Sequence, residues 1–287
     1  MIVVTGATGG LGNGVVRALL RRGVPAGEVV AAVRNPEKAS DLAALGVVVR
    51  EADYDRPETL GPALEGARRV LLVSSVGPDE VRIAQHRAVI DAARAAGVEL
   101  LAYTSIVNAD TNPLGLAEVH RATERAIAES GIPSVLLRNG WYTENYLWLL
   151  PGAVARGELF GAAGEGLVAS AARADYAEAA AIVLTSDDQA GRVYELTGST
   201  AWTLADLAAE AAKVSGKPVV YRDLPGEELA RALAADGLPP AAVDIFVDAD
   251  LGVAAGALAT VTDELPTLLG RPTTPLADSV AEALRAG

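Results

Sequence analysis

The sequence predicts an α/β protein built on a doubly wound parallel sheet, with a smaller α/β lobe in its C-terminal part. Short apolar runs alternate with helix-like segments, a glycine-rich loop follows the first run, and the alternation becomes irregular after Trp148. Alternating strands and helices are typical of a parallel sheet that helices cover on both faces. In such sheets ligands bind where the strands end, so the residues that follow each strand are the candidates for function.

The expected strands are short runs rich in β-branched residues. Most of them are continuously apolar, which is the pattern of parallel strands buried on both faces. Aromatic residues make up only 4% of the chain, so we expect a core of Val, Leu, Ile and Ala. The expected strands are Ile2–Val4, Glu28–Val33, Gly46–Glu51, Arg69–Ser75, Leu100–Ser105, Ser134–Asn139 and Arg192–Gly198.

Helix signals separate these runs. Apolar residues at positions 11, 15, 18 and 19 have the spacing of one helix face. Asn35 before Pro36, and Asp55 shortly before Pro57, indicate two further helix starts. Asp175 is expected to cap a later helix.

The C-terminal lobe contains helix signals and one short strand. Thr203 is expected to cap a helix that ends near Gly216, and Pro218–Leu224 follows as a short strand. We therefore expect a nucleotide-binding domain over residues 1–150, to which the strand at 192–198 returns. Residues 151–287 are then mostly a substrate-binding lobe.

The composition excludes several classes of function. The chain has 287 residues, 24 basic against 37 acidic, and a net charge of −13, which disfavours nucleic acid and anionic membranes as partners. It has no cysteine, so disulfides, zinc–thiolate sites and cysteine nucleophiles are excluded. With His86 and His120 as the only histidines, we expect no metal site. No signal peptide or apolar run of membrane-spanning length is apparent, so a soluble cytoplasmic protein is expected.

The stretch "TGATGGLG" has the pattern of a dinucleotide-binding loop. It lies between a β-branched run and an amphipathic helix, as a Rossmann-type fingerprint requires. Gly6 permits the tight turn, Gly9 lets the backbone approach a pyrophosphate, and Gly12 lets the helix pack on the strand. Backbone N–H groups and the helix dipole then hold the anion. The residues expected to bind the dinucleotide here are Gly6, Thr8, Gly9, Gly10, Leu11 and Gly12.

The end of the second strand favours a phosphorylated ribose. Enzymes that bind NAD place an acidic residue there, whereas this chain has Arg34 and, one turn later, Lys38. A guanidinium can fork onto a 2′-phosphate and stack on adenine. The cofactor is therefore expected to be NADPH, and the alternative is that Arg34 is a solvated loop residue.

Other strand ends supply further candidates, each with two interpretations. Asp53 and Tyr54 follow the third strand, where adenine would lie, although Asp53 can equally cap the next segment. Ser74 and Ser75 end the fourth strand near the expected ribose and nicotinamide. Their hydroxyls either bind the ribose or satisfy loop backbone groups.

Longer motifs resemble a known family. "AAVRNPEKA", "AYTSIVNADTNPLGLAEVHRATE" and "LLRNGWYTENYL" are similar to segments of the bacterial type 2 NAD(P)H:quinone oxidoreductases. These belong to the NmrA-like atypical short-chain dehydrogenase/reductases, with the triphenylmethane reductases as close cousins. The similarity continues through "ASAARADYAEAAA" and "VYELTGSTAWTL" and covers almost the whole chain. It implies a Rossmann-type domain, a small substrate lobe and NADPH-dependent reduction of quinones.

The resemblance also assigns residues near the reacting groups. Ser105 matches the serine of short-chain reductases, but the helix with His120 lacks their Tyr-x-x-x-Lys pair. Without that proton donor, hydride transfer to a quinone is favoured over ketone chemistry. Tyr142 and Asn145 are expected to orient the quinone, with packing as the alternative for Tyr142 and for the neighbouring Trp141. The loop residues implied to line the cofactor are Asn139, Gly140, Trp141 and Tyr142.

Other functions stay open at this stage. The missing Tyr/Lys pair also suits NmrA-like regulators that sense NADP(H) without turnover. Reduction of triphenylmethane dyes, or of ketones or imines with Tyr103 or Tyr142 as proton donor, is a further alternative. The chain has Gly10 where the quinone reductases carry glutamine, so a side-chain contact to the substrate is lost. A small-molecule acceptor is the expected partner, and a homodimer is possible.

Overall fold

The computed structural model describes residues 1–286 and contains two compact units, which are described separately. The first unit comprises Met1–Asp110, Ala117–Asn139 and Arg173–Leu196. The second comprises Thr111–Leu116, Gly140–Ala172 and the chain from Thr197 onward. The boundary expected at residue 150 lies at Asn139–Gly140 instead. A helix within the expected lobe, α8 (Arg173–Thr185), also belongs to the first unit, because it packs along helix α1 (Gly10–Arg21).

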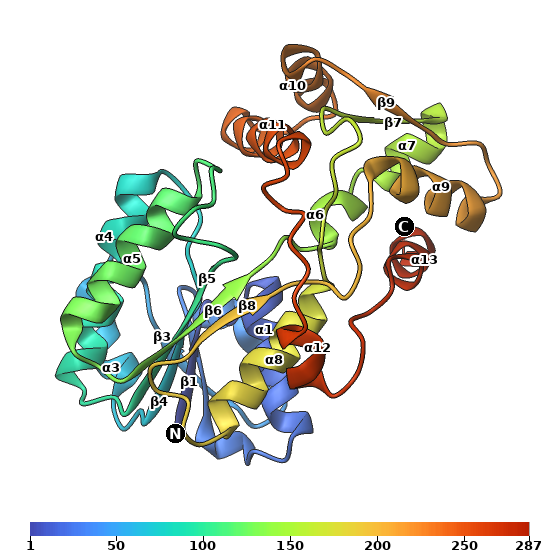
Figure 1. The fold of residues 1–287 in the computed structure, drawn as a ribbon. Coiled ribbons are helices and arrows are strands. Elements are labelled where there is room, and N and C mark those ends of the chain that lie inside the picture. The colour runs from blue at the N-terminus through green and yellow to red at the C-terminus, as the bar shows by residue number, and fades with distance from the viewer. Residues whose placement is uncertain (287) are drawn as a thin grey trace. The chain divides into compact units, whose positions relative to one another are not determined.

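The first unit is built on a seven-stranded parallel sheet in the order β3-β2-β1-β4-β5-β6-β8 (Figure 1). The sheet confirms the predicted doubly wound Rossmann-type fold, and each predicted strand overlaps an observed one. The strand order reverses between β1 and β4, so a ligand site is expected at the carboxyl ends of these strands. The strands are β1 (Ile2–Thr5), β2 (Val29–Val33), β3 (Val48–Glu51), β4 (Arg69–Leu72), β5 (Leu100–Ile106), β6 (Ser134–Asn139) and β8 (Val193–Leu196).

Helices cover both faces of this sheet. In Figure 1, α3, α4 and α5 lie on one face and α1 and α8 on the other. The remaining helical segments of the unit are short: η1 (Ala26–Glu28), η2 (Pro36–Ala39), α2 (Ser40–Ala43) and η3 (Pro57–Thr59). The covering helices not yet bounded are α3 (Leu60–Leu64), α4 (Asp79–Ala95) and α5 (Ala117–Ser130).

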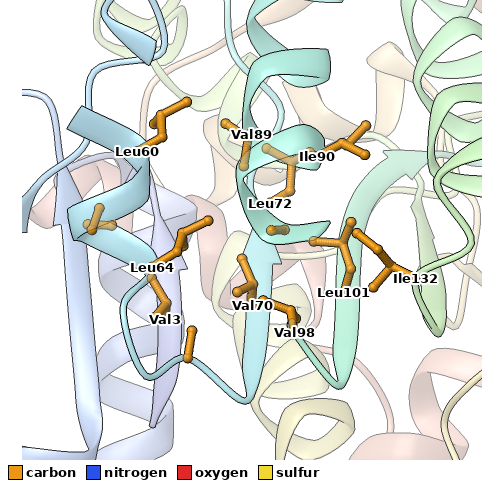
Figure 2. Close-up of a cluster of buried hydrophobic side chains, with 14 of the residues drawn as sticks. Val3, Leu60, Leu64, Val70, Leu72, Val89, Ile90, Val98, Leu101 and Ile132 are labelled. Atoms are coloured by element: carbon orange, nitrogen blue, oxygen red, sulfur yellow. The ribbon is translucent and has the colours of Figure 1, made fainter. Parts of the chain in front are cut away.

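The core between the sheet and helices α3 and α4 is aliphatic. Figure 2 shows Leu60 and Leu64 of α3 and Val89 of α4 facing Val70 of β4 and Leu101 of β5. All five side chains are buried. Burial of such side chains contributes about 1.5–3 kcal/mol each, which holds the strand ends of this region in fixed positions.

The predicted helix starts had mixed outcomes. Asn35 accepts a hydrogen bond from the backbone N–H of Glu37, as a capping residue does. Asp55 does not cap: η3 starts after Arg56, and the Asp55 carboxylate instead accepts from Gln85 Nε2 at 2.8 Å. The cap predicted at Asp175 is wrong, because α8 already begins at Arg173 and Asp175 lies in its first turn.

The second unit contains a two-stranded parallel sheet and several helices. Strand β9 (Val220–Asp223) lies within the predicted strand, and β7 (Glu158–Gly161) was not predicted. Thr203 caps α9 through a reciprocal capping box with Asp206, and Gly216 ends this helix with φ +68°. The helices are α6 (Glu144–Leu147), α7 (Leu150–Arg156), α9 (Leu204–Ser215), α10 (Gly226–Ala235), α11 (Pro240–Ala254), α12 (Glu264–Leu269) and α13 (Leu276–Ala286). Over residues 1–286, none of the helices has the length and apolar character needed to span a membrane.

Candidate functional site

The glycine loop has the close backbone packing of an anion-binding turn. Gly6 has φ +58°, which favours glycine, and its carbonyl accepts from the N–H of Gly9 at 2.9 Å. A Cβ on Gly12 would lie 2.4 Å from the carbonyl oxygen of Gly6, so only glycine fits there. The loop joins the carboxyl end of β1 to the N-terminus of α1, whose free N–H groups and dipole attract anions.

The loop residue Gly10 faces an arginine from the neighbouring helix. A Cβ added at Gly10 would lie 3.0 Å from Nη1 and 3.1 Å from Cδ of Arg173. A Cβ on Gly14, one turn later, would lie 2.9 Å from Cβ of Ala177. Helices α1 and α8 therefore run side by side from their N-termini, and the small residues of α1 permit this close approach.

The Tyr54 hydroxyl bonds the strand ends next to the glycine loop. Its hydroxyl lies against Thr5 Oγ1 and donates to the carbonyl of Val73 at 3.1 Å. Thr5 Oγ1 in turn donates to the carbonyl of Leu71 and accepts from the N–H of Val73, both at 3.0 Å. Burial raises the pKa of Tyr54 above its ordinary value. The Tyr54 hydroxyl therefore ties β3 to β1 and β4, and its polar atom is already engaged.

Asp53 has the contacts of a turn-capping residue. Its carboxylate accepts from the N–H of Asp55 at 3.1 Å and from Nε of Arg56 at 3.3 Å. Of the two interpretations, capping describes the contacts within the chain. A bond to adenine stays a prediction.

Arg34 and Lys38 are exposed beside the carboxyl end of β2. Within residues 1–286, neither side chain has an ion pair. The nearby Arg17, by contrast, is neutralised by Asp41 at 2.5 Å. The structure thus leaves two cations open to an anion at this strand end and places no acidic residue directly after β2.

The serines after β4 bind the chain itself. Ser74 accepts at Oγ from Nη2 of Arg82 at 3.0 Å, and its N–H donates to Thr104 Oγ1 at 2.9 Å. Ser75 donates its N–H to Nε2 of His86 at 2.9 Å. The Ser75 hydroxyl lies 3.2 Å from the same nitrogen. Both hydroxyls therefore contact side chains of α4, and only the Ser74 hydroxyl also bonds a loop backbone group, the carbonyl of Ser75 at 3.5 Å. Contact of either serine with a ribose stays a prediction.

Both histidines are buried and neutral. Nε2 of His86 accepts from Ser75, so Nδ1 carries the hydrogen and donates to Thr123 Oγ1 at 2.8 Å. Nδ1 of His120 lies 2.8 Å from the hydroxyl of Tyr103. Burial, helped by the charge of Arg82, lowers the pKa of each histidine to about 3. In residues 1–286 no group of three His, Cys, Asp or Glu side chains has the arrangement of a metal site.

Ser105 lies in a buried polar network rather than beside a tyrosine. Its hydroxyl donates to Glu124 at 2.5 Å, and Glu124 forms an ion pair with Arg138 at 2.6 Å. Arg138 also pairs with Asp110 and Glu195. No sequence motif indicates this network, because its members come from β5, the segment that follows it, α5, β6 and β8.

The loop after β6 begins the second unit, apart from Asn139, which ends β6 and is buried in the first. Tyr142 forms a β-bridge with Ala171 and is half-buried. The carbonyl of Tyr142 accepts from the N–H of Asn145 at 3.0 Å. This turn brings Tyr142 and the half-buried Asn145 together, so two polar side chains lie on one short segment. Gly140 and Trp141 precede them and are also partly exposed.

The sequence matches a family model described as NAD(P)H-binding over residues 6–187. That span includes the glycines of the loop and the strands from β2 to β6. The chain belongs to the NAD(P)H-binding family. Membership confirms the prediction of a dinucleotide-binding protein that was made from the loop and its flanking strand and helix.

Relatives within the NAD(P)H-binding family are similar over almost their full length. Quinone oxidoreductase 2 of Escherichia coli is 51% identical, covering 98% of each chain. A crystal structure of an NADPH-dependent quinone oxidoreductase from E. coli, complexed with NADPH, has a TM-score of 0.94 and covers 99% of this chain and 100% of the other. Triphenylmethane reductase of Citrobacter sp., complexed with NADP(H), is 39% identical, with a TM-score of 0.95 and coverage of 99% and 100%. The predicted resemblance to these enzymes is confirmed.

Proposed function

We propose that the protein is an NADPH-dependent quinone oxidoreductase that uses neither metal nor flavin. The single observation that carries this proposal is the 51% identity, over 98% of both chains, to a quinone oxidoreductase. The NAD(P)H-binding family and the similarity to an NADPH complex support the cofactor. When bound, NADPH supplies a hydride, and the protein supplies binding, orientation and electrostatics.

The residues that follow the strands fit this cofactor. We assign the pyrophosphate to Gly6–Gly12, including Thr8, Gly9, Gly10 and Leu11, because the backbone packing and helix dipole there suit an anion. We assign the 2′-phosphate to Arg34 and Lys38, which have no ion pair among residues 1–286. A guanidinium suits a phosphate through bidentate hydrogen bonds.

The remaining cofactor contacts are assigned from their place along the sheet. We assign adenine to Asp53 and Tyr54, which follow β3. Tyr54 contributes its ring, because its hydroxyl already bonds Thr5 and Val73. We assign the ribose and nicotinamide to two segments. These are Ser74 and Ser75 after β4, and Asn139–Tyr142 at the end of β6. Backbone atoms suit this task at Gly140 and Trp141.

On the acceptor side, we assign Tyr142 and Asn145 to orient the quinone. Their polar side chains lie on one turn and are partly exposed. We also assign Ser105 to the acceptor side, because it lies near the carboxyl end of β5, where Glu124 accepts from its hydroxyl. A helix without the Tyr-x-x-x-Lys pair suits an acceptor whose charge spreads over a ring and whose protons come from water.

A second candidate is reduction of triphenylmethane dyes. The relative of 39% identity and TM-score 0.95 carries the name triphenylmethane reductase. Such dyes are conjugated cations that accept a hydride, so the same cofactor chemistry applies. Cytoplasmic location and a homodimer also remain part of the proposal, for test by fractionation and by light scattering.

The test is a screen of NADPH oxidation with quinones, triphenylmethane dyes, ketones and imines. We expect oxidation with quinones and about a 10-fold loss of kcat/KM in Tyr142→Phe, the size of one lost hydrogen bond of about 1.4 kcal/mol. Binding of NADPH without oxidation by any acceptor would favour the regulator and overturn the enzyme proposal. Turnover with dyes alone would favour the second candidate.

A further inference from the structure

A buried guanidinium at the end of β4 has no place in the functions assigned so far. Arg82 lies in the first turns of α4, and its side chain is 11% exposed. Its Nη2 donates to Oγ of Ser74 at 3.0 Å. Because Ser74 follows β4 and its N–H donates to Thr104 of β5, the guanidinium lies where these two strands end.

The charge of Arg82 is poorly compensated. Its nearest carboxylate oxygen, Oδ1 of Asp79, lies 3.9 Å from Nη1, beyond the 2.7–2.9 Å or so of a charge-assisted hydrogen bond. The Asp79 side chain is 54% exposed, so water screens this pair. Nε of Arg82 is buried, and among residues 1–286 it has no hydrogen-bond partner. Burial accordingly lowers the pKa of Arg82.

Apart from Asp79, the titratable side chains around Arg82 are neutral. His86 and His120 are uncharged, in part because the charge of Arg82 lowers their pKa, and burial keeps Tyr103 protonated. A desolvated cation among neutral groups is costly unless an anion or a strong acceptor also binds there. This arrangement indicates a ligand that carries negative charge at some stage.

The sheet order indicates which ligand. Arg34 and Lys38 follow β2, so the adenosine half of a dinucleotide falls over β1, β2 and β3. The nicotinamide half then falls over β4 and β5, beyond the point where the strand order reverses. The glycine loop, which holds the pyrophosphate, follows β1. Arg82 therefore lies on the nicotinamide side, next to the place where hydride leaves.

We propose that Arg82 is a catalytic residue that stabilises the negative charge developing on the acceptor oxygen. The inference rests on the proposed quinone reduction. The quinone gains a hydride, which is two electrons and one hydrogen nucleus, and becomes a hydroquinone monoanion while the nicotinamide is oxidised. One proton from water then completes the hydroquinone. A guanidinium does not give up its proton, so its contribution is electrostatic.

Ser74 completes this arrangement. Its Oγ accepts from Arg82 and donates to the carbonyl of Ser75 at 3.5 Å, a long and weak contact that a ligand oxygen can replace. The guanidinium polarises this hydroxyl toward donation. The pair thus provides one charge and one donor at the end of β4, which takes the place of the missing tyrosine and lysine without transferring a proton.

The first experiment compares Arg82→Gln with Arg87→Gln, an exposed arginine on the same helix. We expect kcat for a quinone to fall by about 100-fold in Arg82→Gln, the effect of losing one anion-stabilising donor. NADPH affinity, measured by fluorescence titration, should stay within twofold in both variants. Added guanidinium ion should restore part of the activity of Arg82→Ala and leave wild type unchanged, which separates lost charge from lost fold.

The second experiment needs no turnover. 4-Nitrophenol is titrated on the protein saturated with NADP⁺, and absorbance reports the phenolate. We expect wild type to lower the apparent pKa of the bound phenol and Arg82→Gln to lose this shift. Equal phenol pKa values in both proteins, or a loss of NADPH affinity without guanidinium rescue, would overturn the inference. Failure of wild type to reduce any quinone would instead overturn the proposed function.

Discussion

At the scale of single residues, cofactor choice depends on Arg34. Its side chain is exposed and has no ion pair within residues 1–286, so it is available to a 2′-phosphate. Arg34→Ala should weaken NADPH binding by about 10- to 100-fold, as expected for a charged hydrogen-bonding group worth about 1.5–3 kcal/mol. NADH binding should change little. Fluorescence titration with both cofactors checks this, and equal losses would contradict the assignment.

Gly12 is the residue at which the loop tolerates least change. In Gly12→Ala the new Cβ would lie 2.4 Å from the Gly6 carbonyl oxygen, so the helix or the loop must shift. We expect a loss of several kcal/mol in unfolding free energy or a loss of NADPH binding, measured by urea unfolding and titration. Gly27→Ala is the matched control, because its Cβ would meet nothing within 4 Å. If both variants behave alike, close packing at Gly12 is not the reason for the glycine.

At the scale of elements, α4, β5 and α5 are joined by buried polar side chains. His86 of α4 bonds Thr123 of α5, and Tyr103 of β5 bonds His120 of α5. These contacts hold α4 and α5 together and α5 against β5, the strand that carries Ser105. The cost is that two histidines must stay neutral inside the protein.

This arrangement predicts acid sensitivity. Both histidines have a folded pKa of about 3 against 6.5 unfolded, so the unfolded chain binds more protons below pH 6.5. Their contribution to stability is complete above pH 6.5 and is lost as the pH falls toward 3. The unfolding free energy should drop by up to about 1.4 kcal/mol per pH unit for each histidine. Urea unfolding from pH 7 to 4.5 measures this slope, and a double His86→Gln, His120→Gln variant with an unchanged slope would refute it.

At the scale of the whole molecule, the features that could be predicted from the sequence are those that short local residue patterns encode. Most strands of the large sheet are apolar runs, and the glycine loop has fixed spacing, so both were predicted. Strand β7 was not predicted, because it is only four residues long, with alternating burial and no flanking apolar run. The network of Ser105, Glu124, Arg138 and Glu195 was not predicted, because its members are far apart along the chain. The burial of Arg82 has the same cause, since it depends on contacts made by β4 and β5.

The division of the chain into two units has a consequence for the order in which the protein is made. The first unit includes α8 and β8, yet residues 140–172 of the second unit are synthesised before them. A nascent chain that has emerged only as far as Asn139 has a sheet edge at β6 without β8 and an apolar side of α1 without α8. The ribosome must therefore release about 60 further residues before this unit can close, and over that interval an uncovered strand edge is open to chaperones or to aggregation.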